Sequence, residues 1–231
     1  MHGFTQSGRS WAPVLPALEA AGIGRADVEV VTPDVPDGTG LTDVAATLAA
    51  QCGPAAWLGY SMGGRIGLHV ALARPDVVER LVLVGATAGI DDSIDRATRR
   101  ESDEGWAALV ERVGVRAFLD EWLAQPMFAS LPPDAAGMEA RLENTTARLA
   151  QQLRTLGTGS QRPLWDRLHE MDMPVLVIAG ERDAKFTALG QRLVAAIGDN
   201  ASMLVVADAG HACHLENPPA FAAAVAPFLR P

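Results

Sequence analysis

The stretch Trp57-Leu-Gly-Tyr-Ser-Met-Gly-Gly-Arg65 joins an apolar run to a segment with helical periodicity. Within it, Gly59-Tyr-Ser-Met-Gly63 matches the pattern Gly-x-Ser-x-Gly, which is typical of a nucleophile elbow. In this sharp strand-to-helix turn the glycines lack the Cβ atoms that would clash, and the serine hydroxyl projects from the top of a sheet. We therefore expect Ser61 to be the reactive hydroxyl.

Two later segments supply partners for this serine. Pro174-Val-Leu-Val-Ile-Ala-Gly-Glu-Arg-Asp183 is an apolar run that ends on an acid, and Ser202-Met-Leu-Val-Val-Ala-Asp-Ala-Gly-His211 is one that ends on a histidine. A serine becomes reactive when a neutral imidazole accepts its proton and a carboxylate orients that imidazole. The order Ser61, Asp183, His211 is that of an α/β-hydrolase triad. Considered singly, such an aspartate is often a loop cap and such a histidine a structural residue.

An oxyanion hole is expected beside the serine. In this fold one donor is the backbone N–H of the residue after the nucleophile, here Met62, and the second comes from a loop that follows an earlier strand. His2-Gly-Phe4 resembles that loop, so the N–H of Phe4 should point at the developing negative charge. Losing one such donor raises the barrier by about 3 to 4 kcal/mol.

The start of the sequence conflicts with this expectation. Met1 directly precedes His2, so the sequence holds no upstream strand to carry the oxyanion loop. We expect the N-terminal strands of the fold to be missing, either because the natural reading frame starts further upstream or because the chain is a shortened form. A shift of Phe4 by about one ångström would cost about a hundredfold in rate.

The pattern elsewhere predicts an α/β fold with one insertion. Short apolar strands are expected at 28–33, 55–59 and 80–85, and again from 174 and from 202. Residues 87–162 instead show apolar residues at spacings of three and four, which indicates helices. We predict an α/β-hydrolase core of residues 1–86 and 163–231, with a mostly parallel sheet and helices on both faces. A helical cap of residues 87–162 is inserted over its C-terminal edge.

Composition and charge exclude several classes of partner. The formal net charge is −9 and the pI is near 5.0, and no cluster of lysines or arginines creates the positive field that nucleic acid or an anionic membrane requires. No apolar window of about 18 residues could span a bilayer. No signal peptide is evident, so we expect a cytoplasmic protein.

The cysteines and histidines do not indicate a metal site. Cys52 and Cys213 are too few and too far apart for a disulfide framework or a zinc signature. Cys213 lies between His211 and His214, but ligands at such short spacing on a loop rarely close a tetrahedral site. We expect neither a metal nor a cofactor.

Several motifs together resemble one family over nearly the whole chain. Three of them are His2-Gly-Phe-Thr5, the elbow stretch through Arg65, and Gly210-His-Ala-Cys-His-Leu-Glu-Asn-Pro218. Two more are specific enough to separate the family from general esterases: Trp122 with Gln125-Pro-Met-Phe-Ala-Ser130, and Gly180-Glu-Arg-Asp-Ala-Lys-Phe186. The chain resembles the MenH family, the 2-succinyl-6-hydroxy-2,4-cyclohexadiene-1-carboxylate synthases of menaquinone biosynthesis.

The resemblance implies a lyase rather than a hydrolase. Such an enzyme removes a proton from 2-succinyl-5-enolpyruvyl-6-hydroxy-3-cyclohexene-1-carboxylate, after which the enolpyruvyl group leaves as pyruvate. Ser61, made basic by His211 and Asp183, would abstract the proton. The amides of Phe4 and Met62 would stabilise the oxyanion on the succinyl carbonyl, and no acyl-enzyme is needed.

The resemblance also implies a set of substrate contacts. Because the substrate carries several carboxylates, a net acidic protein needs cations in its pocket. Arg65 lies four residues after Ser61, near the positive end of the elbow helix. The other positions that match the family's pocket are Arg99, Arg141, Trp122 and Tyr60.

Ordinary interpretations of these residues stay open. Arginines on an amphipathic cap helix are usually solvated or paired with acids, Arg96 competes with Arg99, and Trp106 and Trp122 also suit a cap core. Two other functions compete: an esterase or C–C bond hydrolase that forms an acyl-serine, and a truncated, non-catalytic ligand binder. We expect the partner to be a small anionic polycarboxylate and the assembly to be a monomer or homodimer.

Overall fold

A four-stranded parallel sheet runs through the centre of the molecule. The computed structural model describes residues 1–24 and 28–230, and its strands pair in the order β1-β2-β3-β4. The middle strands are near-continuous apolar runs because both of their faces are covered, as is usual in parallel sheets. The strands are β1 (Ala55–Tyr60), β2 (Val78–Val84), β3 (Val175–Gly180) and β4 (Ala201–Val206).

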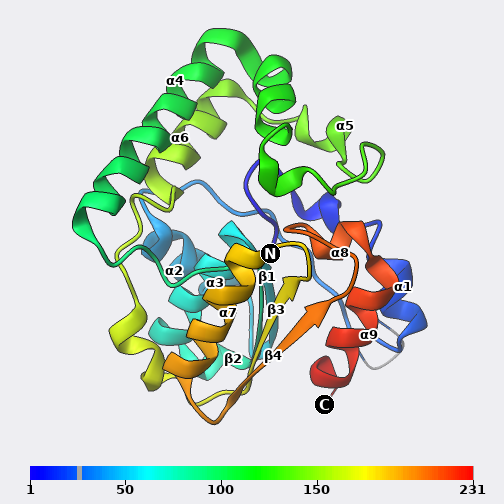
Figure 1. Cartoon of the computed structure of the whole chain (residues 1–231). Coiled ribbons are helices and arrows are strands. Elements are labelled where there is room, and N and C mark those ends of the chain that lie inside the picture. The colour runs from blue at the N-terminus through cyan, green and yellow to red at the C-terminus, as the bar shows by residue number, and fades with distance from the viewer. Residues whose placement is uncertain (25–27, 231) are drawn as a thin grey trace.

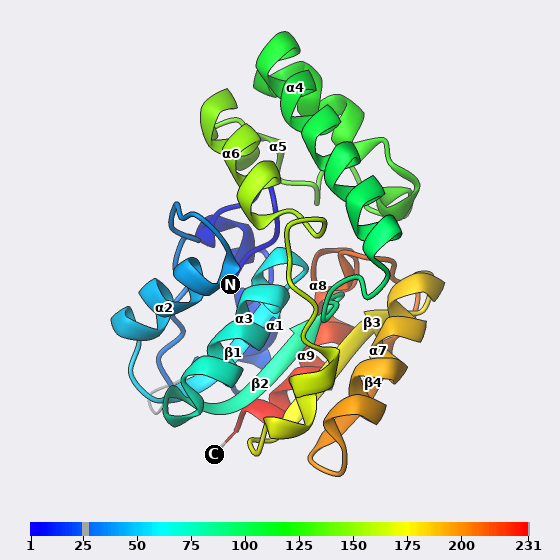
Figure 2. The same ribbon diagram turned by 90° about the vertical axis from the view of Figure 1, so that its left-hand side faces the viewer.

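Helices cover both faces of this sheet, which confirms the predicted α/β fold. In Figure 1, α2, α3 and α7 lie to the left of the strands and α1, α8 and α9 to the right, and Figure 2 views the first group from the front. Alternate strand residues face opposite clusters, Leu81 and Leu83 one and Val82 the other. The helices are α1 (Leu15–Ala20), α2 (Leu41–Gln51), α3 (Met62–Ala73), α7 (Ala184–Ile197), α8 (Cys213–Glu216) and α9 (Pro218–Leu229). Short 3₁₀ turns are η1 (Gly8–Trp11), η2 (Pro75–Val77) and η4 (Trp165–Glu170).

The predicted strand at 28–33 is wrong. In the described part of the chain this stretch belongs to no sheet, and Val31 is 65% exposed. Pro33 has no N–H for a strand ladder. The stretch is followed by Val35, whose N–H donates to the buried Nε2 of His2 (2.9 Å). The imidazole of His2 therefore fixes the segment around Val35 by a hydrogen bond, in place of the strand pairing that we expected for residues 28–33.

The edge of β1 carries the first residue of the chain. The Met1 amine donates to the carbonyl oxygen of Leu58 (2.6 Å), and the Tyr60 N–H donates to the carbonyl oxygen of Met1 (3.1 Å). Within residues 1–24 and 28–54 the structure has no strand. Two backbone hydrogen bonds between Met1 and β1 therefore anchor the start of the oxyanion loop, where we expected a full strand to be needed.

A group of helices between β2 and β3 forms a second layer, which we call the helical insertion. It consists of α4 (Ser93–Leu123), η3 (Pro126–Phe128), α5 (Met138–Arg141) and α6 (Thr146–Leu156). Figure 1 shows it above the upper ends of the strands. Asp92 caps α4 by accepting from two N–H groups, and Gly114 interrupts the helix with a φ of 81°. No helix among the described residues, α4 included, has the length and apolar character needed to cross a membrane.

Candidate active site

Ser61 occupies the turn between β1 and α3. Its φ of 50° lies in the left-handed region, and its N–H donates to the carbonyl oxygen of Val84 (2.8 Å) on the next strand. The turn is so tight that a Cβ on Gly59 would lie 2.3 Å from the carbonyl oxygen of Gly63. This is the geometry of a nucleophile elbow, and it explains why glycine is required on the strand side.

The structure brings the three predicted triad residues together. The Nδ1 of His211 lies 2.8 Å from Oδ2 of Asp183, and its Nε2 lies 3.4 Å from the Oγ of Ser61. Asp183 follows β3 and caps α7, since its Oδ1 accepts from the N–H of Phe186 (3.1 Å). One carboxylate oxygen thus fixes the loop while the other orients the imidazole, which leaves Nε2 free to accept the serine proton.

The loop that carries His211 is held by a residue that the sequence reasoning did not single out. Glu216 accepts from the N–H of Gly210 (2.7 Å) and from the N–H of Ala212 (3.0 Å), the two neighbours of the histidine. The ring of Phe186 packs 4.4 Å from the imidazole. Glu216 lies in the Gly210–Pro218 motif, five residues after His211. This proximity in the sequence is the signal that could have indicated its role in holding the histidine loop.

The two residues predicted to supply the oxyanion donors line the same cavity as the serine. Met62 is the first residue of α3, so its N–H belongs to the unpaired first turn of that helix. Phe4 lies in a turn in which the Gln6 N–H donates to the carbonyl oxygen of Gly3 (3.3 Å) and the Gly3 N–H donates to the Gln6 Oε1 (2.9 Å). Gln6 therefore braces the loop.

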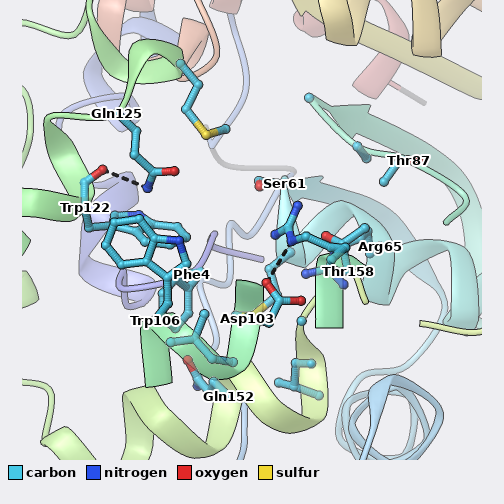
Figure 3. Close-up of a pocket in the computed structure, with 18 of the residues that line it drawn as sticks. Phe4, Ser61, Arg65, Thr87, Asp103, Trp106, Trp122, Gln125, Gln152 and Thr158 are labelled. Atoms are coloured by element: carbon cyan, nitrogen blue, oxygen red, sulfur yellow. Dashed lines mark hydrogen bonds and ion pairs between the residues drawn. The ribbon is translucent and has the colours of Figure 1, made fainter. Parts of the chain in front are cut away.

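A cavity of about 250 Å³ lies between Ser61 and the helical insertion. Figure 3 shows Phe4, Trp106 and Trp122 grouped on one side of it and Arg65 on the other. All of the predicted oxyanion and substrate residues line this one cavity together with the serine: Phe4, Met62, Tyr60, Arg65, Arg99, Trp122 and Arg141. The lining also includes Lys185 of the Gly180–Phe186 motif, and residues that no motif indicated, among them Asp103 and Gln152.

Arg65 is a buried cation without an acidic partner. It is 7% exposed, and the side-chain hydrogen bond it makes is to Oε1 of Gln161 (3.5 Å). Desolvation, with a further contribution from the nearby charge of Arg99, lowers the pKa of Arg65 to about 10, although the more distant carboxylate of Asp103 acts in the opposite direction. The guanidinium is still charged at neutral pH, and no carboxylate among the described residues lies within ion-pair distance of it.

Arg141 is also buried away from carboxylates. It is 3% exposed, and its Nε donates to the carbonyl oxygen of Ala136 (2.7 Å) while its Nη1 donates to the hydroxyl of Thr5. Burial lowers the pKa of Arg141 below its usual value. Two of the three predicted arginines therefore bring positive charge to the cavity without forming an ion pair with any of the described residues.

Arg99 differs because it already has a counter-ion. Its Nε donates to Oδ1 of Asp103 (2.8 Å), and the other oxygen of this buried carboxylate accepts from the N–H of Gly159 (3.0 Å). Arg96 turns away, donating to the carbonyl oxygens of Ile90 and Asp91, and is not among the cavity residues described. Of the two competitors, the structure places Arg99 at the site.

Aromatic side chains form the wall opposite Arg65 (Figure 3). The Trp122 ring lies 4.9 Å from Phe4 and 5.2 Å from Trp106. Trp122 thus contacts both the oxyanion loop and the core of the insertion, so the two interpretations of this residue are compatible. Tyr60 is buried against the rings of His211 (5.4 Å) and His214 (4.3 Å), and burial raises the pKa of its hydroxyl.

Comparisons with known proteins agree with this geometry. A model of the alpha/beta hydrolase family matches residues 1–224. The 2-succinyl-6-hydroxy-2,4-cyclohexadiene-1-carboxylate synthase of Serratia proteamaculans is 32% identical over 241 residues, which cover 99% of this chain and 91% of that protein. The enzyme of the same name from Klebsiella pneumoniae is 35% identical over 178 residues, covering 75% and 68%.

Solved structures show the same likeness. The structure of MenH from S. aureus superposes with a TM-score of 0.90 at 27% identity, covering 99% of this chain and 91% of that one. A thermophilic esterase from Thermogutta terrifontis, at 23% identity and a TM-score of 0.75, shares the fold alone. The matches extend over nearly the whole chain, and the structure has the elbow with an imidazole and a carboxylate beside it. The chain therefore belongs to the alpha/beta hydrolases and, within them, to the 2-succinyl-6-hydroxy-2,4-cyclohexadiene-1-carboxylate synthase family.

Proposed function

We propose that this protein is a 2-succinyl-6-hydroxy-2,4-cyclohexadiene-1-carboxylate synthase that eliminates pyruvate from 2-succinyl-5-enolpyruvyl-6-hydroxy-3-cyclohexene-1-carboxylate. The observation that carries the proposal is the pair of buried guanidiniums, Arg65 and Arg141, that line one cavity with Ser61 and have no carboxylate partner in the described chain. A buried charge without a partner is costly. A substrate with several carboxylates supplies the missing partners, whereas a neutral ester does not.

The reaction follows from the placement of the donors and acceptors. His211 Nε2 accepts the Ser61 proton as the serine oxygen takes a proton from the ring carbon of the substrate. The electron pair of that C–H bond first gives the enolate of the succinyl carbonyl. As the enolate collapses, a C=C bond forms at the deprotonated ring carbon, the ring C=C bond shifts by one position, and the C–O bond to the enolpyruvyl group breaks. The enolpyruvate that leaves takes up a proton and becomes pyruvate. The N–H groups of Phe4 and Met62 stabilise the negative charge on the succinyl carbonyl.

The helical insertion acts in this proposal as the cap of the active site. It contributes Arg99, Trp122 and Arg141 to the cavity, and it separates the cavity from solvent, which strengthens charge interactions inside. The proposed ligand is therefore a small polycarboxylate.

We keep the cytoplasm as the predicted location and a monomer or homodimer as the predicted assembly.

Replacement of Arg65 tests the proposal directly. We expect Arg65→Ala to lower kcat/KM for pyruvate release by about a hundredfold or more, because a desolvated carboxylate loses its charge-assisted hydrogen bonds. Pyruvate is measured with a coupled dehydrogenase. Arg112→Ala, an exposed arginine of the insertion, is the matched control and should leave the rate unchanged.

Two results would contradict the lyase assignment. One is a wild-type chain that releases no pyruvate but gives a burst of product with an activated ester, which indicates an acyl-serine hydrolase. The other is an Arg65→Ala variant with full lyase activity. A chain that neither eliminates pyruvate nor hydrolyses esters, but melts at a higher temperature with the substrate, would be a ligand binder.

A further inference from the structure

The oxyanion loop contains a turn that its own sequence disfavours. The Gln6 N–H donates to the carbonyl oxygen of Gly3, and Thr5, at the third position of this turn, has a φ of 66°. Turns with a positive φ at that position normally have glycine or asparagine there. A β-branched residue in this conformation is a backbone outlier. The surrounding structure must therefore hold Thr5 in place.

The support comes from the helical insertion. Nδ2 of Asn144 donates to the carbonyl oxygen of Thr5 (2.9 Å), across 139 positions of the sequence, and Nη1 of Arg141 donates to the threonine hydroxyl. The Asn144 amide also donates to the carbonyl oxygen of Arg141 (2.9 Å), which fixes its own orientation. Thr5 is 1% exposed, so water has little access to replace these contacts.

The supported turn carries the predicted oxyanion donor. Phe4 directly precedes Thr5, and its ring packs against Trp122 of the insertion. If Thr5 relaxed to a negative φ, the peptide between Phe4 and Thr5 would rotate and Phe4 would move relative to Ser61. A displacement of about one ångström at such a site costs about a hundredfold in rate.

We propose that Asn144 is a positioning residue of the oxyanion hole, and that its amide keeps Thr5 in the left-handed conformation that aims the Phe4 N–H at the reacting oxygen. The identity of that oxygen rests on the proposed function. The helical insertion would thus position the oxyanion loop in addition to covering the cavity. In Figure 1 the dark-blue N-terminal segment rises between the sheet and the insertion near α5.

A pair of substitutions separates this role from general stabilisation. Asn144→Ala removes the clamp and is expected to lower kcat about ten- to a hundredfold with KM changed less than about twofold. Thr5→Gly removes the need for a clamp, because glycine adopts a positive φ without strain. The double variant Thr5→Gly/Asn144→Ala should therefore recover most of the kcat of Thr5→Gly alone.

Glu143→Ala is the matched control. Glu143 precedes Asn144 and ties the same part of the insertion to the N-terminal segment through an exposed ion pair with Arg9. The hydrogen bonds from the insertion to Thr5 come instead from Arg141 and Asn144. We expect this variant to keep the wild-type kcat. If Glu143→Ala lowered kcat as much as Asn144→Ala does, the docking of the insertion and not the conformation of the Thr5 turn would control the rate. That result would overturn the proposal.

Amide hydrogen exchange of the peptide covering residues 2–8 gives a readout that does not depend on lyase activity. Exchange should rise in Asn144→Ala and return towards the wild-type level in the double variant. If the wild-type chain releases no pyruvate, the proposed function fails while this comparison still tests the clamp. Unchanged exchange in Asn144→Ala, an unrescued kcat in the double variant, or a rise in KM at constant kcat would each overturn the proposal. If Asn144→Ala alone does not fold, the double variant compared with Thr5→Gly decides the question by the same criteria.

Discussion

Arg65, Arg99 and Arg141 share a cavity but differ in what neutralises them. Asp103 neutralises Arg99, so a substrate carboxylate there competes with an existing ion pair. Arg65 and Arg141 have neutral partners, Gln161 for the first and Thr5 for the second. Because breaking or lacking a buried pair costs several kcal/mol, the two unpaired arginines should contribute more to substrate affinity than Arg99 does.

Removal of the triad side chains should reveal their unequal roles. We expect Ser61→Ala and His211→Ala each to lower kcat by about three orders of magnitude or more, since the first removes the base and the second the proton acceptor. Asp183→Asn should cost less, because the imidazole stays and only its orientation is impaired. Steady-state pyruvate release measures each effect, and the exposed His169→Ala serves as control. Full activity in Ser61→Ala would show that another group is the base.

At the scale of elements, the sequence was informative where an apolar run and a turn motif coincide. The runs before Ser61, Asp183 and His211 gave β1, β3 and β4, since a parallel strand buried on both faces leaves a continuous apolar signal. Residues 28–33 have the same β-branched composition, but two prolines nearby and an exposed Val31 show that composition alone does not make a strand. Within the insertion, the positive φ of Gly114 breaks the regular geometry of α4.

Two glycines should respond in opposite directions to the same change. Gly59→Ala places a Cβ against backbone at 2.3 Å and is expected to reduce the free energy of unfolding by about 3 kcal/mol, because neither chain segment of the elbow can move aside. Gly105→Ala adds a methyl group in open space on α4, where alanine favours the helix by up to about 1 kcal/mol. Urea unfolding of both variants measures the difference, and equal effects would contradict the close packing described at the elbow.

At the scale of the whole molecule, buried histidines connect distant parts of the fold. His2 joins the oxyanion loop to Val35, and His214 packs between Trp11 and Tyr60. Burial lowers the pKa of His2 to about 4 and that of His214 to about 3. The protein therefore folds around neutral imidazoles, and the Nε2 of His2 must stay unprotonated to accept its hydrogen bond.

This arrangement predicts a loss of stability in mild acid. Between pH 6.5, where histidines of the unfolded chain become protonated, and about pH 4, the unfolded state binds protons that the folded state excludes. Stability should therefore fall as the pH is lowered through this window, by about 2 kcal/mol for each such histidine at pH 4.5. Thermal unfolding from pH 7.5 to 4.5 measures the slope. His214→Leu should flatten it, while the exposed His169→Leu should not.

The site was predictable to the extent that its residues lie in motifs. Ser61, Asp183 and His211 follow strands, and the strands bring them together. Asn144, by contrast, acts through a contact with Thr5, which is 139 positions away in the sequence, and such a contact leaves no spacing pattern. The need for Asn144 in particular arises only because Thr5 has a positive φ, which is a property of the fold.

The helical insertion has its own apolar cluster, built around Ala107, Phe118 and Leu149, apart from the two clusters that flank the sheet. The insertion contacts the catalytic machinery at the stretch around Phe4 and Thr5 and, through Phe128, at His211. Any evolutionary exchange of this module must bring a new brace for that turn, or a glycine in place of the threonine.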